Sequence, residues 1–339
     1  MTVADIRSSC LKPLIVLPLI LLLAFPSVSI QGASDGLTLW FHVVLPSLLP
    51  FLICTQSIVA LGQISFLLTP VSPAIRRVFG FGAEGAYALL CGLVCGYPVG
   101  ARLCSMFLEN GSISEKEAKT LLAICSQPSP MFLLGYVAAT LPLQLPSLLI
   151  LASVWLPVFP LFCLAAHHYG FQKDTSASCT ENTPASTDRP ARSGQSRLDA
   201  IILSSFETMV LVGGYIILFS ILSAWVAMAP IAPAAKPLLS AVLEMTTGIH
   251  AVCQTLPPKA AVPVSLAAAA FGGLSGLFQV AGVLPPQTPK NAGFAIRHRF
   301  LNPRAPLGSD YPVWKILHAC LTGLTAAVLL RVLSPALLH

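Results

Sequence analysis

Long apolar segments recur along the whole chain and decide its class. A helix needs about 20 mostly apolar residues to cross the hydrocarbon core of a membrane. Six segments meet this requirement, and they predict membrane-spanning helices at residues 13–30, 37–61, 119–141, 146–168, 200–229 and 312–335. The pattern therefore predicts an all-α polytopic membrane protein.

Three further apolar stretches are interrupted by residues that break helices or are costly in lipid. Residues 84–106 and 260–284 are rich in glycine, and residues 237–256 carry Glu244 beside two threonines. Glycine and proline weaken a helix, and ionisable side chains are expensive inside a bilayer. None of the three stretches is predicted to be a plain span.

A polar segment divides the chain into two parts. Residues 167–198 are crowded with Ser, Thr, Pro and charged residues, a composition that predicts a disordered cytoplasmic linker. The first membrane repeat, with its N-terminal span, then covers residues 1–166 and the second covers residues 199–339. Each half contains an apolar helix, a Pro-rich charged piece and a Gly-rich stretch in that order, which predicts a degenerate internal repeat.

The placement of basic residues predicts which segments cross the membrane. Arg7 and Lys12 precede the first apolar run, which reads as an uncleaved span with a cytoplasmic N-terminus; a signal peptide is the alternative. The basic residues of the linker then stay cytoplasmic only if residues 84–106 enter and leave the membrane on the same side. We therefore predict re-entrant Gly-rich hairpins in two inverted repeats, a plan common among secondary transporters.

The second half fits this topology less well. An inverted second half puts the basic stretch 285–311 on the outer face, unless residues 237–256 cross the membrane completely. The sequence is compatible with either arrangement of residues 237–256.

The first candidate for chemistry is the run from Cys91 to Arg102, which turns through glycine and proline inside apolar sequence. A helix should break near Gly96–Gly100, and unpaired backbone groups survive in hydrocarbon only where protein or a water-filled cavity satisfies them. The helix that follows would present free N–H groups to a ligand. The alternative is that these residues only permit a kink or close helix packing.

Helix-breaking residues also occur in Ser126-Gln-Pro-Ser-Pro130, which interrupts the span that follows. Two prolines and three polar side chains within a span are hard to explain by packing, so this run favours a binding site beside the first tip. In the second half, the counterpart tip is expected at Phe271–Gln279. The predicted solute-binding residues are Gly96, Tyr97, Pro98, Gly100, Arg102, Ser126, Gln127, Ser129, Gly273, Ser275 and Gln279.

Two carboxylates lie in apolar surroundings, Glu207 and Glu244. Either could take up a proton or bind a cation during transport, and either could equally be a satisfied interfacial residue.

Composition narrows the class of function. Only 9% of the 339 residues are charged and 55% are hydrophobic, against about 25% and 45–50% in soluble domains. The net charge of +6 comes from residues between the apolar segments, where it sets topology, and no basic stripe with aromatic residues predicts nucleic-acid binding. The lipid bilayer and a small solute are the expected partners.

Enzyme and cofactor motifs are missing from the sequence. The ten cysteines form no C-x-x-C pair, the seven histidines are scattered, and neither a G-x-S-x-G nor a P-loop motif occurs. We expect no catalytic residues, no metal and no cofactor.

Five motifs together resemble the YlbJ-type sporulation integral membrane proteins, within the wider group that carries nucleoside-recognition or Gate domains. They are Leu45-Pro-Ser-Leu-Leu-Pro-Phe51, Gly96-Tyr-Pro-Val-Gly-Ala-Arg102, Ser126-Gln-Pro-Ser-Pro130, Gly213-Gly-Tyr-Ile-Ile-Leu-Phe219 and Phe271-Gly-Gly-Leu-Ser275 with Gln279. At Ser126–Pro130 the group is expected to have an Asn/Thr-Ser-Asn-Pro type of run, so this chain departs from the pattern there.

The resemblance implies a permease or secondary transporter in a bacterial cell membrane. In the sporulation branch it implies provision of a small solute to the developing spore, with an organic anion such as dipicolinate as the leading candidate. The alternative is a non-transporting scaffold or assembly factor in spore envelope formation, in which the breaks serve packing alone.

Overall fold

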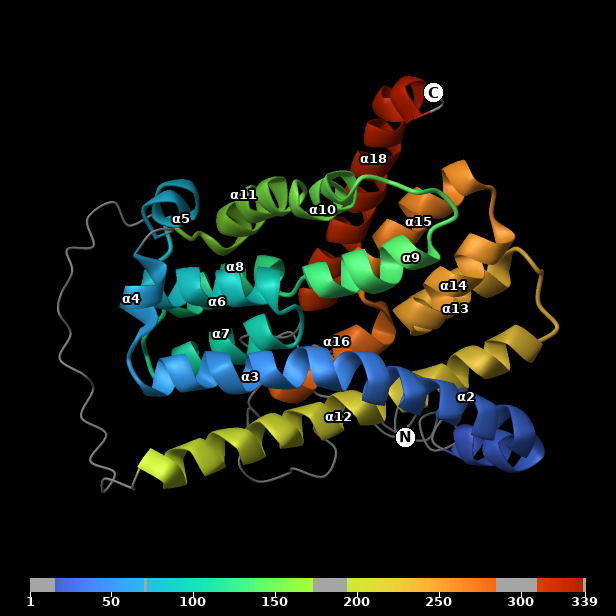
Figure 1. Cartoon of the computed structure of the whole chain (residues 1–339), viewed down its shortest axis with the longest axis horizontal. Helices are drawn as coiled ribbons and strands as arrows, with labels where there is room; N and C mark the ends of the chain where they lie inside the picture. The colour runs from blue at the N-terminus through green and yellow to red at the C-terminus, as the bar shows by residue number, and fades with distance from the viewer. Residues whose placement is uncertain (1–15, 70–71, 173–193, 285–309, 338–339) are drawn as a thin grey trace, which may run out of the picture.

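Helices account for all the regular structure among the described residues. The computed structural model describes residues 16–69, 72–172, 194–284 and 310–337 (Figure 1). The predicted all-α fold is therefore confirmed for these parts of the chain. Most of the linker, and nearly all of the basic stretch 285–311, lie outside the described residues.

The chain begins with one long, nearly continuous helix. After a helical segment at 16–24, a break at Phe25 leads into α2 (Pro26–Leu39), the π-helical η1 (Trp40–Val44) and α3 (Leu45–Ala60). The sequence predicts two separate spans, at residues 13–30 and 37–61, and this prediction is wrong because Pro26–Ala60 is one continuous helical stretch. Gly32 and Gly36 are helical and press against α12 (Gly194–Met228).

Small residues explain why the helix continues there. A Cβ added at Gly36 would lie 2.9 Å from Cα of Ile217, and one at Gly32 would lie 3.0 Å from Cβ of Ala224. Glycine lets helices in a membrane approach closely. The residues that suggest a loop in the sequence therefore form a helix–helix contact.

The middle of the molecule is built from a helix pair and an interrupted helix. After the short α4 (Ile64–Leu68) and α5 (Ser72–Phe79), α6 (Ala83–Val94) and α7 (Val99–Glu109) pack side by side and are joined by a tight turn. Next come α8 (Glu115–Cys125), a break, η2 (Phe132–Val137) and the short α9 (Ala138–Thr140). The first part of the chain ends with α10 (Ser147–Trp155) and α11 (Val158–Tyr169).

The second part of the chain again has a long helix, a packed helix pair and an interrupted helix, in that order. The long α12 leads to a packed helix pair, α13 (Ala235–Leu243) and α14 (Met245–Thr255). An interrupted helix follows, α15 (Pro258–Phe271) and α16 (Gly273–Val283), and the last element is α18 (Tyr311–Leu337).

This order changes where the second pair is found. The sequence predicts the second Gly-rich hairpin at 260–284, whereas the structure has a span, Pro258–Val283, interrupted at Gly272 and Gly273. The packed helix pair lies earlier, at α13 and α14. Re-entrance and inversion of the repeats stay predictions, because they depend on membrane sidedness.

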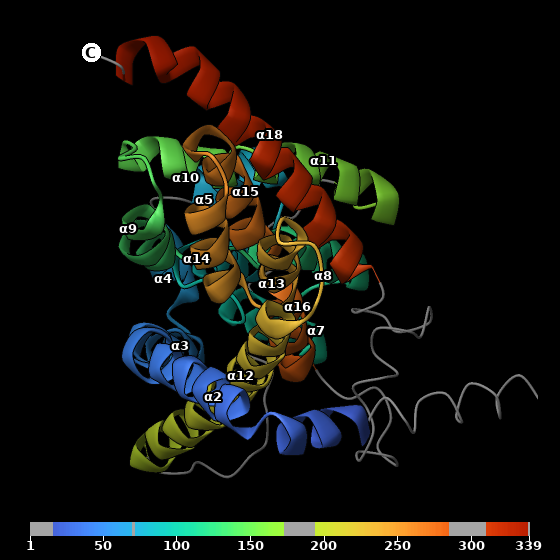
Figure 2. The ribbon, with the colours of Figure 1, turned by 90° about the vertical axis from the view of Figure 1, so that its right-hand side faces the viewer.

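The outer helices carry apolar faces. In Figures 1 and 2, α2, α3 and α12 lie along one side of the molecule, and α10, α11 and α18 lie along the opposite side. Within the described part of the chain, five helices are long and apolar enough to cross a membrane: Pro26–Ala60, Ser147–Tyr169, Leu198–Met228, Pro258–Val283 and Tyr311–Val332. Leu203 and Val210 on α12, and Leu324 and Val332 on α18, are exposed, as expected of side chains that face lipid.

Candidate functional site

The turn between α6 and α7 forms the first tip, Cys95–Pro98. Gly96 has φ +89°, a conformation that favours glycine, and a Cβ there would lie 3.0 Å from the backbone nitrogen of Ser129. The Tyr97–Pro98 peptide bond is cis. The backbone N–H of Tyr97 donates to the carbonyl of Gln127 at 3.0 Å, so the first tip is bonded to the first break.

The first break, Ser126–Pro130, lies between α8 and η2 as the sequence predicts. Its position depends on close packing, because a Cβ at either Gly92 or Gly100 would collide with the carbonyl of Cys125. The Gln127 side chain turns back and donates to the carbonyl of Ile124 at 3.0 Å. Part of the break is therefore satisfied by its own side chain.

The second tip lies between α13 and α14, at Glu244. This side chain is only 2% exposed, and its carboxylate accepts bonds from the backbone N–H of Thr246 at 3.0 Å and of Thr247 at 2.9 Å. Both threonine hydroxyls donate to the same oxygen. Glu244 is thus the N-cap of α14, and its charge offsets the positive end of that helix.

Tyr97 connects the first tip to the second half of the molecule. Its hydroxyl donates to the carbonyl of Ala269 at 3.0 Å and lies 3.0 Å from the sulfur of Met245. The second break follows Ala269, where Gly272 and Gly273 have φ +83° and +69°. A Cβ on Gly272 would lie 2.8 Å from the Tyr97 hydroxyl oxygen, so the glycine makes room for this contact. Both tips and both breaks meet around one tyrosine.

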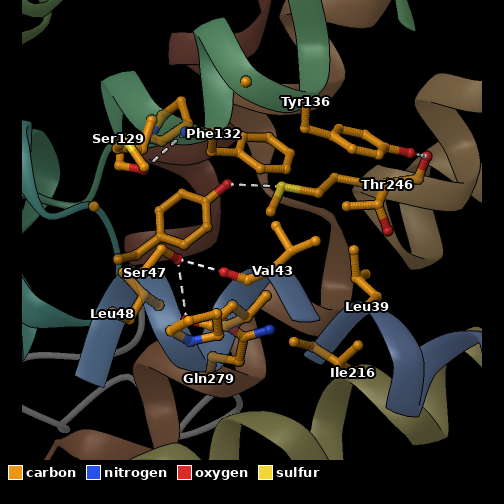
Figure 3. Close-up of a pocket in the computed structure, with 18 of the residues that line it drawn as sticks. Leu39, Val43, Ser47, Leu48, Ser129, Phe132, Tyr136, Ile216, Thr246 and Gln279 are labelled. Atoms are coloured by element: carbon orange, nitrogen blue, oxygen red, sulfur yellow. Dashed lines mark hydrogen bonds between the residues drawn. The ribbon is translucent and has the colours of Figure 1, made fainter. Parts of the chain in front are cut away.

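A cavity of about 410 Å³ opens beside this junction (Figure 3). One wall is formed by η1 and the first turn of α3, including His42 and Ser47, and the other by the tips and η2. Tyr136 donates to the carbonyl of Thr246 at 2.8 Å and closes one end. Of the predicted residues, those that line the cavity are Gly96, Tyr97, Ser129, Gln279 and Glu244.

The other predicted residues lie outside the cavity lining. Gln127 and Ser126 are buried behind it, and Ser275 accepts a bond from Gln279 at 3.0 Å, so it supports a lining residue. The residues that the cavity lining does not include are Pro98, Gly100, Arg102, Ser126, Gln127, Gly273, Ser275 and Glu207.

Arg102 and Glu207 are near each other and away from the cavity. Arg102 is half-buried on α7, within electrostatic reach of Glu207 and Glu109. Glu207 lines a separate groove along the lipid-facing side of α12. The structure therefore does not bring Arg102 to the place where a solute would bind.

Two buried groups on α18 are missing from the predicted site. Lys315 donates to the carbonyl of Ser126 at 2.8 Å, and a ring nitrogen of His318 lies 3.0 Å from the carbonyl of Val154. Both are essentially inaccessible. An ionisable residue inside a span is a functional candidate by default, so a lysine and a histidine three residues apart in the last apolar segment were the available signal.

The chain has sequence similarity to a known sporulation protein. The chain is 27% identical over 295 residues to the sporulation integral membrane protein YlbJ of Bacillus subtilis (strain 168), an alignment covering 77% of this chain and 72% of that protein. This similarity supports the YlbJ-type assignment. An integral membrane relative and several membrane-spanning helices together make this chain a multi-pass membrane protein. No family profile and no solved structure matches it.

Proposed function

We propose that the chain is a permease that carries a small solute across a bacterial membrane. The observation that supports it is the cavity of about 410 Å³ at the meeting point of two helix tips and two helix breaks. Small-molecule sites typically measure roughly 300–1,000 Å³. Interrupted helices around a central site are the arrangement that secondary transporters use to bind substrate and to alternate access.

The lining suits a small planar organic molecule with polar ends. The rings of Phe132 and Tyr136 are stacked, with centroids 5.4 Å apart and planes at 16°, and Tyr97 adds a third ring. Ser129 accepts the backbone N–H of Phe132 at 3.2 Å, which leaves its own hydroxyl proton free to donate. Aromatic walls with a few placed donors are typical of such sites.

An organic dianion such as dipicolinate is the proposed solute. Its pyridine ring matches the aromatic wall, and its carboxylates would accept from Ser129 and Gln279. Positive charge comes from Lys315, which does not line the cavity itself but whose nitrogen lies 5.1 Å from the ring centroid of Tyr97, a lining residue. Arg102 is not part of the proposed site, because it does not line the cavity and its side chain has no described hydrogen bond or cation–π contact with a residue that does.

Glu244 is the better placed of the two candidate coupling carboxylates, because it lines the cavity and Glu207 does not. The B. subtilis relative is named a sporulation protein. We propose the same setting here, with the solute supplied to the developing spore.

Uptake of radiolabelled dipicolinate into proteoliposomes tests the proposal. Ser129→Ala and Gln279→Ala should each lower uptake several-fold, because each removes a donor from the cavity. The matched control is Ser153→Ala, which removes a buried hydroxyl that bonds within α10 at 2.8 Å. Unchanged uptake in both cavity variants would contradict the proposed binding site. Absence of uptake by the wild-type protein would favour the alternative of a non-transporting scaffold.

A further inference from the structure

Lys315 is a buried lysine in a membrane-spanning helix. It lies one turn into α18 and is only 1% exposed. A charged side chain in the hydrocarbon region is costly unless polar groups solvate it. Polar partners are therefore needed to hold its charge inside the protein.

Its described contacts are polar but not acidic. The ammonium nitrogen donates to the carbonyl of Ser126 at 2.8 Å and lies 5.1 Å from the centroid of the Tyr97 ring, within cation–π range. Among the described residues, no carboxylate forms an ion pair with Lys315. The group is thus held by a carbonyl and an aromatic face, which are the kinds of partner that bind a cation.

The carbonyl it contacts belongs to the first break. Where a helix is interrupted, its last carbonyls lose their partners within the helix. Here the carbonyl of Ile124 accepts from the Gln127 side chain, and that of Gln127 accepts from the backbone of Tyr97. The carbonyl of Ser126 is left for Lys315. In transporters with broken helices, carbonyls of this kind commonly coordinate the coupling sodium ion.

We propose that the ammonium group of Lys315 is a tethered cation that fills the carbonyl site of the first break in place of a dissolved sodium ion. The first break then keeps its position beside the first tip without a bound sodium ion. For transport, which rests on the proposed function, the consequence is that solute uptake needs no sodium gradient.

Thermal unfolding of the full chain in lipid nanodiscs tests this directly. The wild-type midpoint should be the same in sodium chloride and in choline chloride. Lys315→Ala should lower the midpoint by several degrees, and ethylammonium should restore it more than choline does, because a small cation can enter the vacated space. Lys315→Met should lower the midpoint without rescue, since its side chain fills that space.

Two further variants complete the test, one as a control and one to separate the charge of Lys315 from its hydrogen bond. Lys119→Ala removes an exposed lysine paired with Glu115 at 2.7 Å and should leave the midpoint unchanged. Lys315→Gln keeps a hydrogen-bond donor but no charge, and should be destabilised.

Three results would overturn the proposal. They are wild-type protein that is stabilised by sodium relative to choline, a Gln variant as stable as wild type, and an Ala variant that ignores ethylammonium. If the Ala variant cannot be purified, the first two measurements still decide. All of them are read without flux, so failure of the permease proposal is recognised separately.

Discussion

Tyr97 connects the first tip to both breaks of the candidate site. Its backbone N–H bonds to the first break, its hydroxyl bonds to Ala269 before the second break, and its ring faces both the cavity and Lys315. A single side chain therefore couples the two halves of the molecule. Any movement of the first tip relative to the end of α15 must break the contact between the Tyr97 hydroxyl and Ala269.

Tyr97→Phe should lower solute uptake and reduce the free energy of unfolding by about 1 kcal/mol, the typical net value of one hydrogen bond. Proteoliposome uptake and thermal unfolding measure the two effects. Tyr87→Phe is a matched control, because Tyr87 is also buried and donates to a carbonyl, that of Thr55, at 2.9 Å. It should lose similar stability and keep uptake; an equal loss of uptake in both variants would contradict the coupling role.

At the scale of elements, the long N-terminal helix depends on its contact with α12. Trp225 donates to the hydroxyl of Ser29 at 2.9 Å, Trp40 donates to the carbonyl of Met209 at 2.9 Å, and two glycines fit between these contacts. Each bond joins the first half of the chain to the second. The interface holds η1 in position as a wall of the cavity.

Gly36→Leu should separate α2 from α12 and lower the unfolding midpoint, because a Cβ at this position already lies 2.9 Å from Ile217. Gly214→Leu is the control, since nothing lies within 4 Å of a Cβ there. Thermal unfolding in nanodiscs compares the two. A variant at Gly36 as stable as that at Gly214 would contradict the packed interface.

Some elements could be predicted from the sequence and others could not, for physical reasons. Proline and glycine at Gly96–Gly100 and at Ser126–Pro130 break helices locally, so both breaks were predictable. Residues 31–36 look like a turn because the glycines that allow helix contact also favour loops. Glu244 caps α14 by accepting four local hydrogen bonds from Thr246 and Thr247, but glutamate is not among the usual N-cap residues, so this signal did not mark the second tip.

The candidate site was predictable in part for the same reason. The cavity is lined by Gly96, Tyr97, Ser129 and Gln279, as predicted. Arg102 was also predicted to bind the solute, but it does not line the cavity. Its position one turn after the tip gives no information on the direction of its side chain. Lys315 joins the site from a helix more than 180 residues after the break that it contacts, a pairing that no local pattern contains.

At the scale of the whole molecule, the predicted repeat has a topological consequence. The order of a long helix, a packed helix pair and an interrupted helix occurs twice, in α3 to α9 and in α12 to α16. If each pair is re-entrant, its two ends face the same side of the membrane. If the repeats are inverted, the two pairs face opposite sides.

Single cysteines in a cysteine-free background should test this with a membrane-impermeant reagent. Gly82→Cys and Ser112→Cys, at the two ends of the first pair, should label from one side. Ala234→Cys and Thr255→Cys, at the ends of the second pair, should label from the other; all four positions are exposed. Labelling of the two ends of one pair from opposite sides would show a crossing and contradict re-entrance.

The measurement that tests the permease account most directly is dipicolinate uptake by a variant whose cavity is filled. Gly135 lines the cavity on η2, and nothing lies within 4 Å of a Cβ added there, so Gly135→Phe should fold and occupy the solute's space. The account predicts that Gly135→Phe abolishes uptake while Gly214→Phe, on the lipid-facing side of α12, keeps it. Full uptake by a stable Gly135→Phe protein would contradict it.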